Sequence, residues 1–181
     1  MIKLTLIIVL LHLISIESYQ NNHPSSTSQS IISQDEIGKE IFFSDFISLS
    51  GEKFNVKSLK GKITLINFWF EGCEPCVAEF GALNKIYIQN KSNKKFKLIS
   101  FTFETPANAL KIANKYKLQY PIICISRAKC YQLNFNNGFP TNIITNQLGQ
   151  TVYLISGGAI DTKEADKEFD NIIKIKIKEL L

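Results

Sequence analysis

The stretch ITLINFWFEGCEPCVAEF, Ile63–Phe80, decides the fold of this 181-residue chain. Its first part, Ile63–Phe70, is mostly β-branched or aromatic, which is typical of a buried strand. In Val77–Ile88, apolar residues recur three or four positions apart, as they do along one face of a helix. The two cysteines, Cys73 and Cys76, therefore lie where a strand turns into a helix.

These two cysteines form a C-x-x-C motif, whose thiols can alternate between a dithiol and a disulfide. Only a thiolate attacks a disulfide, and the unpaired N–H groups at a helix start favour negative charge. We therefore expect Cys73 to be the exposed, attacking thiolate and Cys76 to be the buried resolving thiol. Pro75 suits the first helical turn, whereas the like charge of Glu74 would oppose thiolate formation.

Two alternatives to redox chemistry remain open for this pair, a zinc half-site and a pair of inert core thiols. Zinc usually takes four nitrogen or sulfur ligands. The other cysteines, Cys124 and Cys130, are loosely spaced for zinc, and both histidines, His12 and His23, precede the expected domain. We expect no metal and no other cofactor. A hydrolase with a Cys–His pair is excluded, because the expected domain contains no histidine.

Two segments, residues 45–80 and 138–149, resemble the TlpA/ResA-like thiol–disulfide oxidoreductases, which are AhpC/TSA-related members of the thioredoxin-like superfamily. They contain a hairpin segment, the Asn-Phe-Trp strand, the C-x-x-C motif and a downstream Gly-Phe-Pro-Thr loop. The resemblance covers about residues 36–181. It implies an α/β thioredoxin-like fold, with a central mixed β-sheet flanked by helices and an N-terminal β-hairpin extension.

The resemblance also implies roles for individual residues. Pro140 matches a cis-proline that packs against the active-site disulfide. Phe139 and Thr141, on either side of it, match the place where an extended substrate segment binds, with the backbone of Phe139 forming the pairing. Glu79 matches a buried glutamate that tunes the thiol pKa values and exchanges a proton with Cys76.

Three further positions bear on this resemblance. Asn67 stands where thioredoxin carries a buried aspartate, so Glu79 is the expected substitute for that acid. The alternative for Glu79 is an ordinary solvated helix residue. Gly72 stands where the family usually has Trp, and we therefore expect a flatter and less apolar surface around Cys73.

Cys124 and Cys130 leave three interpretations open. A structural disulfide is common for a second pair in an oxidising compartment, and we favour it. Buried free thiols, which behave as small apolar residues, are the next alternative. A relay of electrons from the C-x-x-C pair is the third.

The amino-terminal sequence predicts export. Lys3 precedes the apolar run Leu4–Ile16, which is shorter than the roughly 20 residues of a membrane span and fits a secretory signal cut after Ser18. An uncleaved anchor is the alternative. Tyr19–Gln34 is rich in Ser, Asn and Gln, as flexible tethers are. We thus predict a signal peptide or anchor (1–18), a flexible linker (19–35) and a thioredoxin-like domain (36–181) in the periplasm or cell envelope.

The charge pattern argues against nucleic acid as a partner. The chain has a formal net charge of +5, but its lysines are scattered and not interleaved with aromatic residues for base stacking. We expect contact with a membrane only through an uncleaved N-terminal segment.

The remaining elements are predicted from apolar periodicity and turn residues. They are a hairpin over Ile41–Val56 turning near 50–52, a turn at 58–61, strands at Phe96–Phe103, Ile122–Ile125, 143–144 and Val152–Ile155, helices at Ala107–Tyr116 and Asp161–Leu181, and a helical turn at Lys129–Leu133.

The predicted function is that of an extracytoplasmic thiol–disulfide oxidoreductase, with reduction favoured as its direction. Cys73 attacks a substrate disulfide and Cys76 resolves the mixed disulfide. The expected partners are protein thiols or disulfides, cytochrome c precursors among them, and an upstream redox partner; the protein is expected to be a monomer. One alternative is a non-catalytic thioredoxin-like peptide-binding module, to which Gly72 gives weight. The other is a peroxiredoxin, which would need an isolated reactive cysteine and an arginine; Arg127 is the only arginine.

Overall fold

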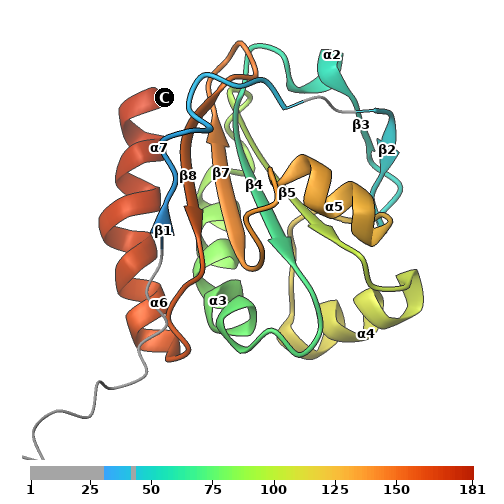
Figure 1. The fold of residues 1–181 in the computed structure, drawn as a ribbon. Helices are drawn as coiled ribbons and strands as arrows, with labels where there is room; N and C mark the ends of the chain where they lie inside the picture. Colours follow the sequence, from blue (N-terminus) through green and yellow to red (C-terminus); the bar gives the residue numbers. More distant parts are fainter. Residues whose placement is uncertain (1–30, 42–43) are drawn as a thin grey trace, which may run out of the picture.

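Strand β4 (Ile63–Trp69) lies in the middle of a six-stranded mixed sheet in the computed structural model, which describes residues 31–41 and 44–181 (Figure 1). All seven of its residues are buried, as the run of β-branched and aromatic residues predicts. It pairs parallel with β5 (Phe96–Thr102) and antiparallel with β7 (Thr141–Thr145). The sheet order is β1-β8-β7-β4-β5-β6, with β6 at Ile122–Cys124 and β8 at Thr151–Ser156.

Helices cover both faces of this sheet (Figure 1). Successive side chains of a strand point to opposite faces, so Leu65 and Trp69 pack into one apolar cluster while Ile66 and Phe68 pack into the other. The first cluster is completed by α3 (Glu74–Asn90), α4 (Pro106–Tyr116) and the carboxyl-terminal helices. The second is completed by α5 (Arg127–Leu133) and by residues of the segment before β4. The thioredoxin-like fold expected from the sequence is confirmed.

The carboxyl-terminal helix differs in detail from the single helix expected over Asp161–Leu181. The side chain of Asp161 caps α6 (Thr162–Glu168), a π-helical turn follows at Phe169–Ile173, and α7 runs over Lys174–Leu180. Through the π-helical turn, buried residues keep a spacing of four, at 169, 173 and 177, and hold this end of the chain on the first cluster.

The segment before β4 differs from its predicted structure in three places. Residues 31–35 were assigned to the linker, yet β1 (Ile31–Ile32) adds to the sheet by pairing antiparallel with β8. The hairpin is shorter than predicted, with β2 (Phe46–Ile47) paired to β3 (Lys53–Phe54). The turn expected at 58–61 contains a short helix, α2 (Val56–Leu59), because Asn55 forms a capping box with Ser58.

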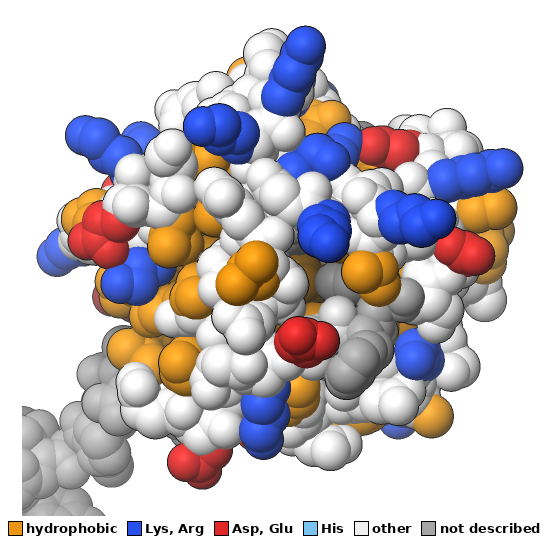
Figure 2. All heavy atoms as spheres, turned by 90° about the horizontal axis from the view of Figure 1, so that it is seen from above, with side chains coloured by type: hydrophobic (Ala, Val, Ile, Leu, Met, Phe, Trp, Pro, Cys, Tyr) orange, Lys and Arg blue, Asp and Glu red, His pale blue; other side chains and the backbone are white. Residues whose placement is uncertain are grey.

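The predicted signal peptide and residues 19–30 of the predicted linker lie outside the described residues. Within residues 31–41 and 44–181, no helix combines the length and apolar character needed to cross a membrane. Figure 2 shows Lys and Arg side chains separated by neutral and apolar ones over one end of the molecule. This arrangement is scattered, as the spacing of the lysines in the sequence predicts.

Candidate active site

A disulfide joins Cys73 and Cys76 at the start of α3, with an S–S distance of 1.97 Å and a Cα–Cα distance of 5.2 Å. Cys73 is the N-cap residue of the helix, and its Sγ accepts a hydrogen bond of 3.3 Å from the backbone N–H of Cys76. Pro75 occupies the first turn, where its missing N–H costs no helical hydrogen bond. In the reduced protein, the same N–H and the helix dipole would stabilise a thiolate on Cys73.

Cys73 is less accessible than expected. In the disulfide form it is 6% exposed and Cys76 is fully buried, because both sulfur atoms pack into the apolar cluster that contains Trp69 and Phe80. The expectation of an exposed Cys73 is therefore wrong for this state, although the order of the two exposures is as predicted. The carboxyl group of Glu74 lies at the surface, on the exposed side of the first turn.

The peptide bond between Phe139 and Pro140 is cis, and it lies beside the start of α3. Gly158 shows how close the two loops are: a Cβ atom there would stand 3.6 Å from Pro140 Cγ and 4.0 Å from Pro75 Cβ. The buried Thr141 donates its hydroxyl proton to the carbonyl oxygen of Gly138 at 2.8 Å. Its side chain therefore holds the loop in shape.

Glu79 lies one turn beyond Cys76 on α3, and it is only 3% exposed. Two amide groups bind its carboxyl group: Asn67 Nδ2 donates to Oε1 at 2.7 Å and Asn142 Nδ2 donates to Oε2 at 2.9 Å. Asn67 Nδ2 also donates to Asn142 Oδ1 at 2.9 Å. The alternative of a solvated helix residue is thus excluded, and Asn67 contributes to the site as a hydrogen-bond donor.

Burial raises the pKa of Glu79 to about 8, because the charged form loses its hydration. The hydrogen bonds from Asn142 and Asn67 act in the opposite direction, while the charge of Glu168 raises the pKa further. The desolvation effect is the largest of these. Around neutral pH the carboxyl group can therefore hold a proton or release one, as a proton carrier must.

The hydrogen-bond network extends to residues that were not identified from the sequence. Ser100 Oγ donates to Asn67 Oδ1 at 3.1 Å and accepts from Trp69 Nε1 at 2.7 Å. Asn142, the second donor to Glu79, was also missed. The available signal was the presence of single polar residues inside otherwise apolar strands, since such residues stay buried only when they have partners.

Cys124 and Cys130 are free thiols in the structure, so the expected disulfide between them is not present. The reason is the alternation of side chains along β6. Cys124 packs toward the first apolar cluster, whereas Cys130 on α5 belongs to the second, on the opposite face of the sheet. Burial raises the pKa of both thiols, that of Cys130 to about 12, so both stay protonated at neutral pH.

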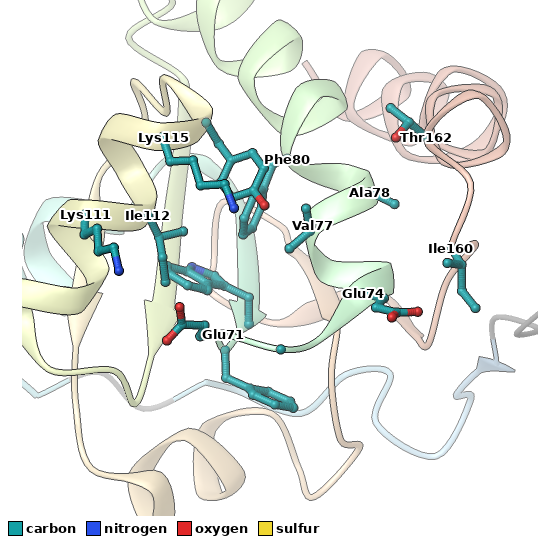
Figure 3. A pocket seen from close by; sticks show the side chains of 14 residues that line it. Glu71, Glu74, Val77, Ala78, Phe80, Lys111, Ile112, Lys115, Ile160 and Thr162 are labelled. Atoms are coloured by element: carbon teal, nitrogen blue, oxygen red, sulfur yellow. The ribbon is translucent and has the colours of Figure 1, made fainter.

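A cavity of about 490 Å³ lies around the start of α3, and both apolar and charged side chains line it (Figure 3). The ring of Phe139 stacks edge-on against Phe70, Phe103 and Tyr131, at centroid distances of 5.3–5.4 Å. Gly72 itself has φ +82°, a left-handed conformation in which larger residues are strained.

Solved structures show the same fold. A putative protein disulfide isomerase from Bacteroides thetaiotaomicron superposes with a TM-score of 0.68 at 22% identity, over 86% of this chain and 94% of that chain. Sequence relatives show the class of activity. The thiol–disulfide oxidoreductase ResA of Bacillus thuringiensis is 30% identical over 123 residues, which are 67% of this chain and 70% of the relative. The thioredoxin-like protein YneN of Bacillus subtilis is 29% identical over 127 residues, covering 68% and 72%.

The fold, the paired cysteines and these relatives define a thiol–disulfide oxidoreductase of thioredoxin-like architecture. The model of the AhpC/TSA family matches residues 39–142, and the chain belongs to that family.

The buried carboxyl group of Glu79 should make the free energy of unfolding depend on pH. The pKa of Glu79 is raised from 4.5 to about 8 in the folded protein, so between these values the unfolded chain binds fewer protons than the folded one. The free energy of unfolding should therefore fall as the pH rises through this window, by up to about 5 kcal/mol. Glu79→Gln should remove this fall, because the amide does not titrate.

Urea unfolding of the oxidised proteins from about pH 5 to about pH 8 measures this difference. Glu74→Gln is the matched control, since it neutralises an exposed carboxyl group on the same helix, and it should keep the wild-type pH dependence. Parallel curves for wild type and Glu79→Gln would contradict the assignment of Glu79 as the titrating group.

Proposed function

We propose that this protein is an extracytoplasmic thiol–disulfide reductase that works through Cys73, Cys76 and Glu79. The observation that carries the proposal is the joint placement of three features. These are a disulfide at a helix start, a cis-proline loop next to it, and a buried carboxyl group one turn below that can exchange a proton near neutral pH.

The reaction begins with the reduced protein. The Cys73 thiolate attacks one sulfur of a substrate disulfide, a new S–S bond forms between protein and substrate, and the substrate's other sulfur leaves as a thiolate and takes up a proton. Cys76 then loses its proton and attacks Cys73, which releases the second substrate thiolate. The substrate gains two electrons and two protons, and the protein keeps the Cys73–Cys76 disulfide. An upstream dithiol donor restores the reduced form.

Glu79 supplies the base for the second attack. Cys76 is fully buried, so water cannot readily take its proton. Residues three apart on a helix lie on the same face, which places the carboxyl group of Glu79 on the side of Cys76. The amides of Asn67 and Asn142 fix the orientation of that carboxyl group. We assign Glu79 as the proton acceptor for Cys76 during resolution.

The cis-proline loop supplies the binding edge for the substrate. Among the described residues, neither the N–H nor the C=O group of Phe139 has a hydrogen-bond partner. The neighbouring carbonyl groups are used within the protein: that of Gly138 accepts from Thr141 and that of Pro140 accepts from the N–H of Gly157. An extended substrate segment can therefore pair with Phe139 alone, as in β-strand addition.

The protein is proposed to act outside the cytoplasm as a monomer, with residues 1–18 as an export signal or anchor and the following residues to position 30 as a tether. The support is the run of apolar residues after Lys3, and the polar composition of the segment that follows. Its proposed substrates are protein disulfides of the periplasm or cell envelope.

Trapping the mixed disulfide tests this mechanism. Reduced Cys76→Ser protein should accumulate a covalent adduct with a disulfide substrate at Cys73, because the resolving thiol is absent. Cys73→Ser should form no adduct, and its reductase rate should fall to background. Mass spectrometry under non-reducing conditions identifies the adduct. Cys124→Ser, which alters a free thiol outside the pair, should keep the wild-type rate. A Cys73→Ser protein with full activity would contradict the mechanism.

Export can be tested with a reporter. Residues 1–35 fused to an alkaline phosphatase, which folds only where its disulfides can form, should give an active enzyme. Leu10→Arg places a charge in the middle of the apolar run and should abolish that activity. An inactive wild-type fusion, made in normal amounts, would contradict the proposed location.

A further inference from the structure

The cavity of about 490 Å³ lies next to the chain segment that carries the reactive disulfide. Gly72 and Glu74, the two chain neighbours of Cys73, both line it. From there it reaches α4 on one side of α3 and Ile160 and Thr162 on the other (Figure 3). Binding sites for small ligands and side chains are commonly clefts of this order of size. A group bound here would lie beside a substrate sulfur that is bonded to Cys73.

The floor of the cavity is apolar, and Tyr116, whose ring packs edge-on against Phe80 at 5.4 Å, adds a hydroxyl group to the lining. Trp69 and Phe80, whose rings stand edge-to-face at 5.3 Å, form it together with Ile112. The single donor of Trp69, its Nε1–H group, is already bonded to Ser100 at 2.7 Å. An apolar group that packs on this floor would gain free energy from burial.

The rim of the cavity is charged. Lys111 and Lys115 extend from α4 on one side, and Glu74 stands on the α3 side (Figure 3). These three side chains are exposed. A polar rim around an apolar floor suits a polypeptide whose backbone stays over the rim while one side chain enters.

Gly72 lines the cavity next to Cys73. Its φ of +82° favours glycine, and a Cβ atom built there would meet no atom within 4 Å apart from those of its two chain neighbours. Phe70 forms the adjacent wall and also packs against Phe139, with ring centroids 5.4 Å apart. Phe70 therefore stands between the cavity and the loop at which the substrate strand is proposed to pair.

We infer that this cavity binds a large apolar side chain of the substrate, with aromatic side chains preferred, from a residue next to the substrate cysteine. The inference rests on the proposed function and adds a substrate class to it: protein disulfides with an aromatic neighbour. An aromatic ring suits the floor because it can pack edge-to-face on Trp69 and Phe80.

The test uses disulfide-linked dimers of short peptides with one cysteine each. In two of the peptides Trp stands either directly before or directly after the cysteine, and in the two matching peptides Ser takes the place of that Trp. The dithiothreitol-reduced and desalted protein is mixed with each dimer, and the second-order rate constant is obtained from released thiol. Burial of one aromatic side chain should raise the rate constant. For at least one of the two Trp positions, the Trp peptide should react at least about fivefold faster than the matching Ser peptide.

Two substitutions fill the cavity from opposite walls, Lys111→Trp and Ile160→Trp, both at exposed positions. Each should bring the ratio of the Trp to the Ser rate constant close to one. Lys178→Trp and Ile175→Trp are the matched controls on exposed positions of α7, and they should keep the wild-type ratio.

The outcomes separate the two proposals. Equal wild-type rate constants for Trp and Ser peptides would overturn the inference and leave the reductase function standing. A ratio that survives both filling substitutions would also overturn it, because the preference would arise elsewhere. Failure of the wild-type protein to reduce either peptide would overturn the proposed function, and the inference with it.

Discussion

A carboxyl group removed from water needs hydrogen-bond donors around it, and this requirement of Glu79 links the parts of the structure. Its two donors come from different strands. Asn67 on β4 and Asn142 on β7 are register partners in the antiparallel ladder, so their side chains point to the same face of the sheet, toward α3. A shift of β7 by one residue in this register would turn Asn142 away from the carboxyl group.

The same register also positions the reactive groups. It pairs Thr141 with Phe68, so the cis peptide bond just before Thr141 falls at the end of β4, where the chain turns into the C-x-x-C motif. The backbone of Gly158, after β8, fits between Pro140 and Pro75. The buried carboxyl group, the disulfide and the cis-proline loop are therefore held by one set of strand contacts.

Local sequence predicted those elements whose stability depends on their own residues. Ile63–Phe70 has the composition of a central strand, and the predicted helices after Cys76 and Pro106 have clear apolar faces; all three appear with small changes of boundary. The short strand β1 was missed because two residues in a polar segment carry no periodic signal, and they form a strand only by pairing with β8. The π-helical turn near Phe169 depends on packing against the first apolar cluster, which sequence spacing does not reveal.

The residues of the site also fall into those that the sequence predicted and those that it did not. The motif identified Cys73 and Cys76, and family resemblance pointed to Glu79 and Pro140. Asn142 and Ser100 were missed because their contact with α3 or β4 requires knowledge of the sheet register. A disulfide between Cys124 and Cys130 was expected only because a second pair of cysteines stands in a protein predicted to be exported. Side-chain alternation on β6 instead places the two thiols on opposite faces of the sheet. The cavity beside Gly72 depends on the space between two helices, which no single segment encodes.

The reduction potential of the Cys73–Cys76 pair tests the central claim of a reductase most directly. The protein is equilibrated in dithiothreitol or glutathione buffers of graded potential, and the two thiols are counted by alkylation and mass. A potential near or below about −270 mV is predicted, as for reductases of this fold that draw electrons from a donor. A potential above about −180 mV, in the range of oxidants and isomerases, would contradict the account.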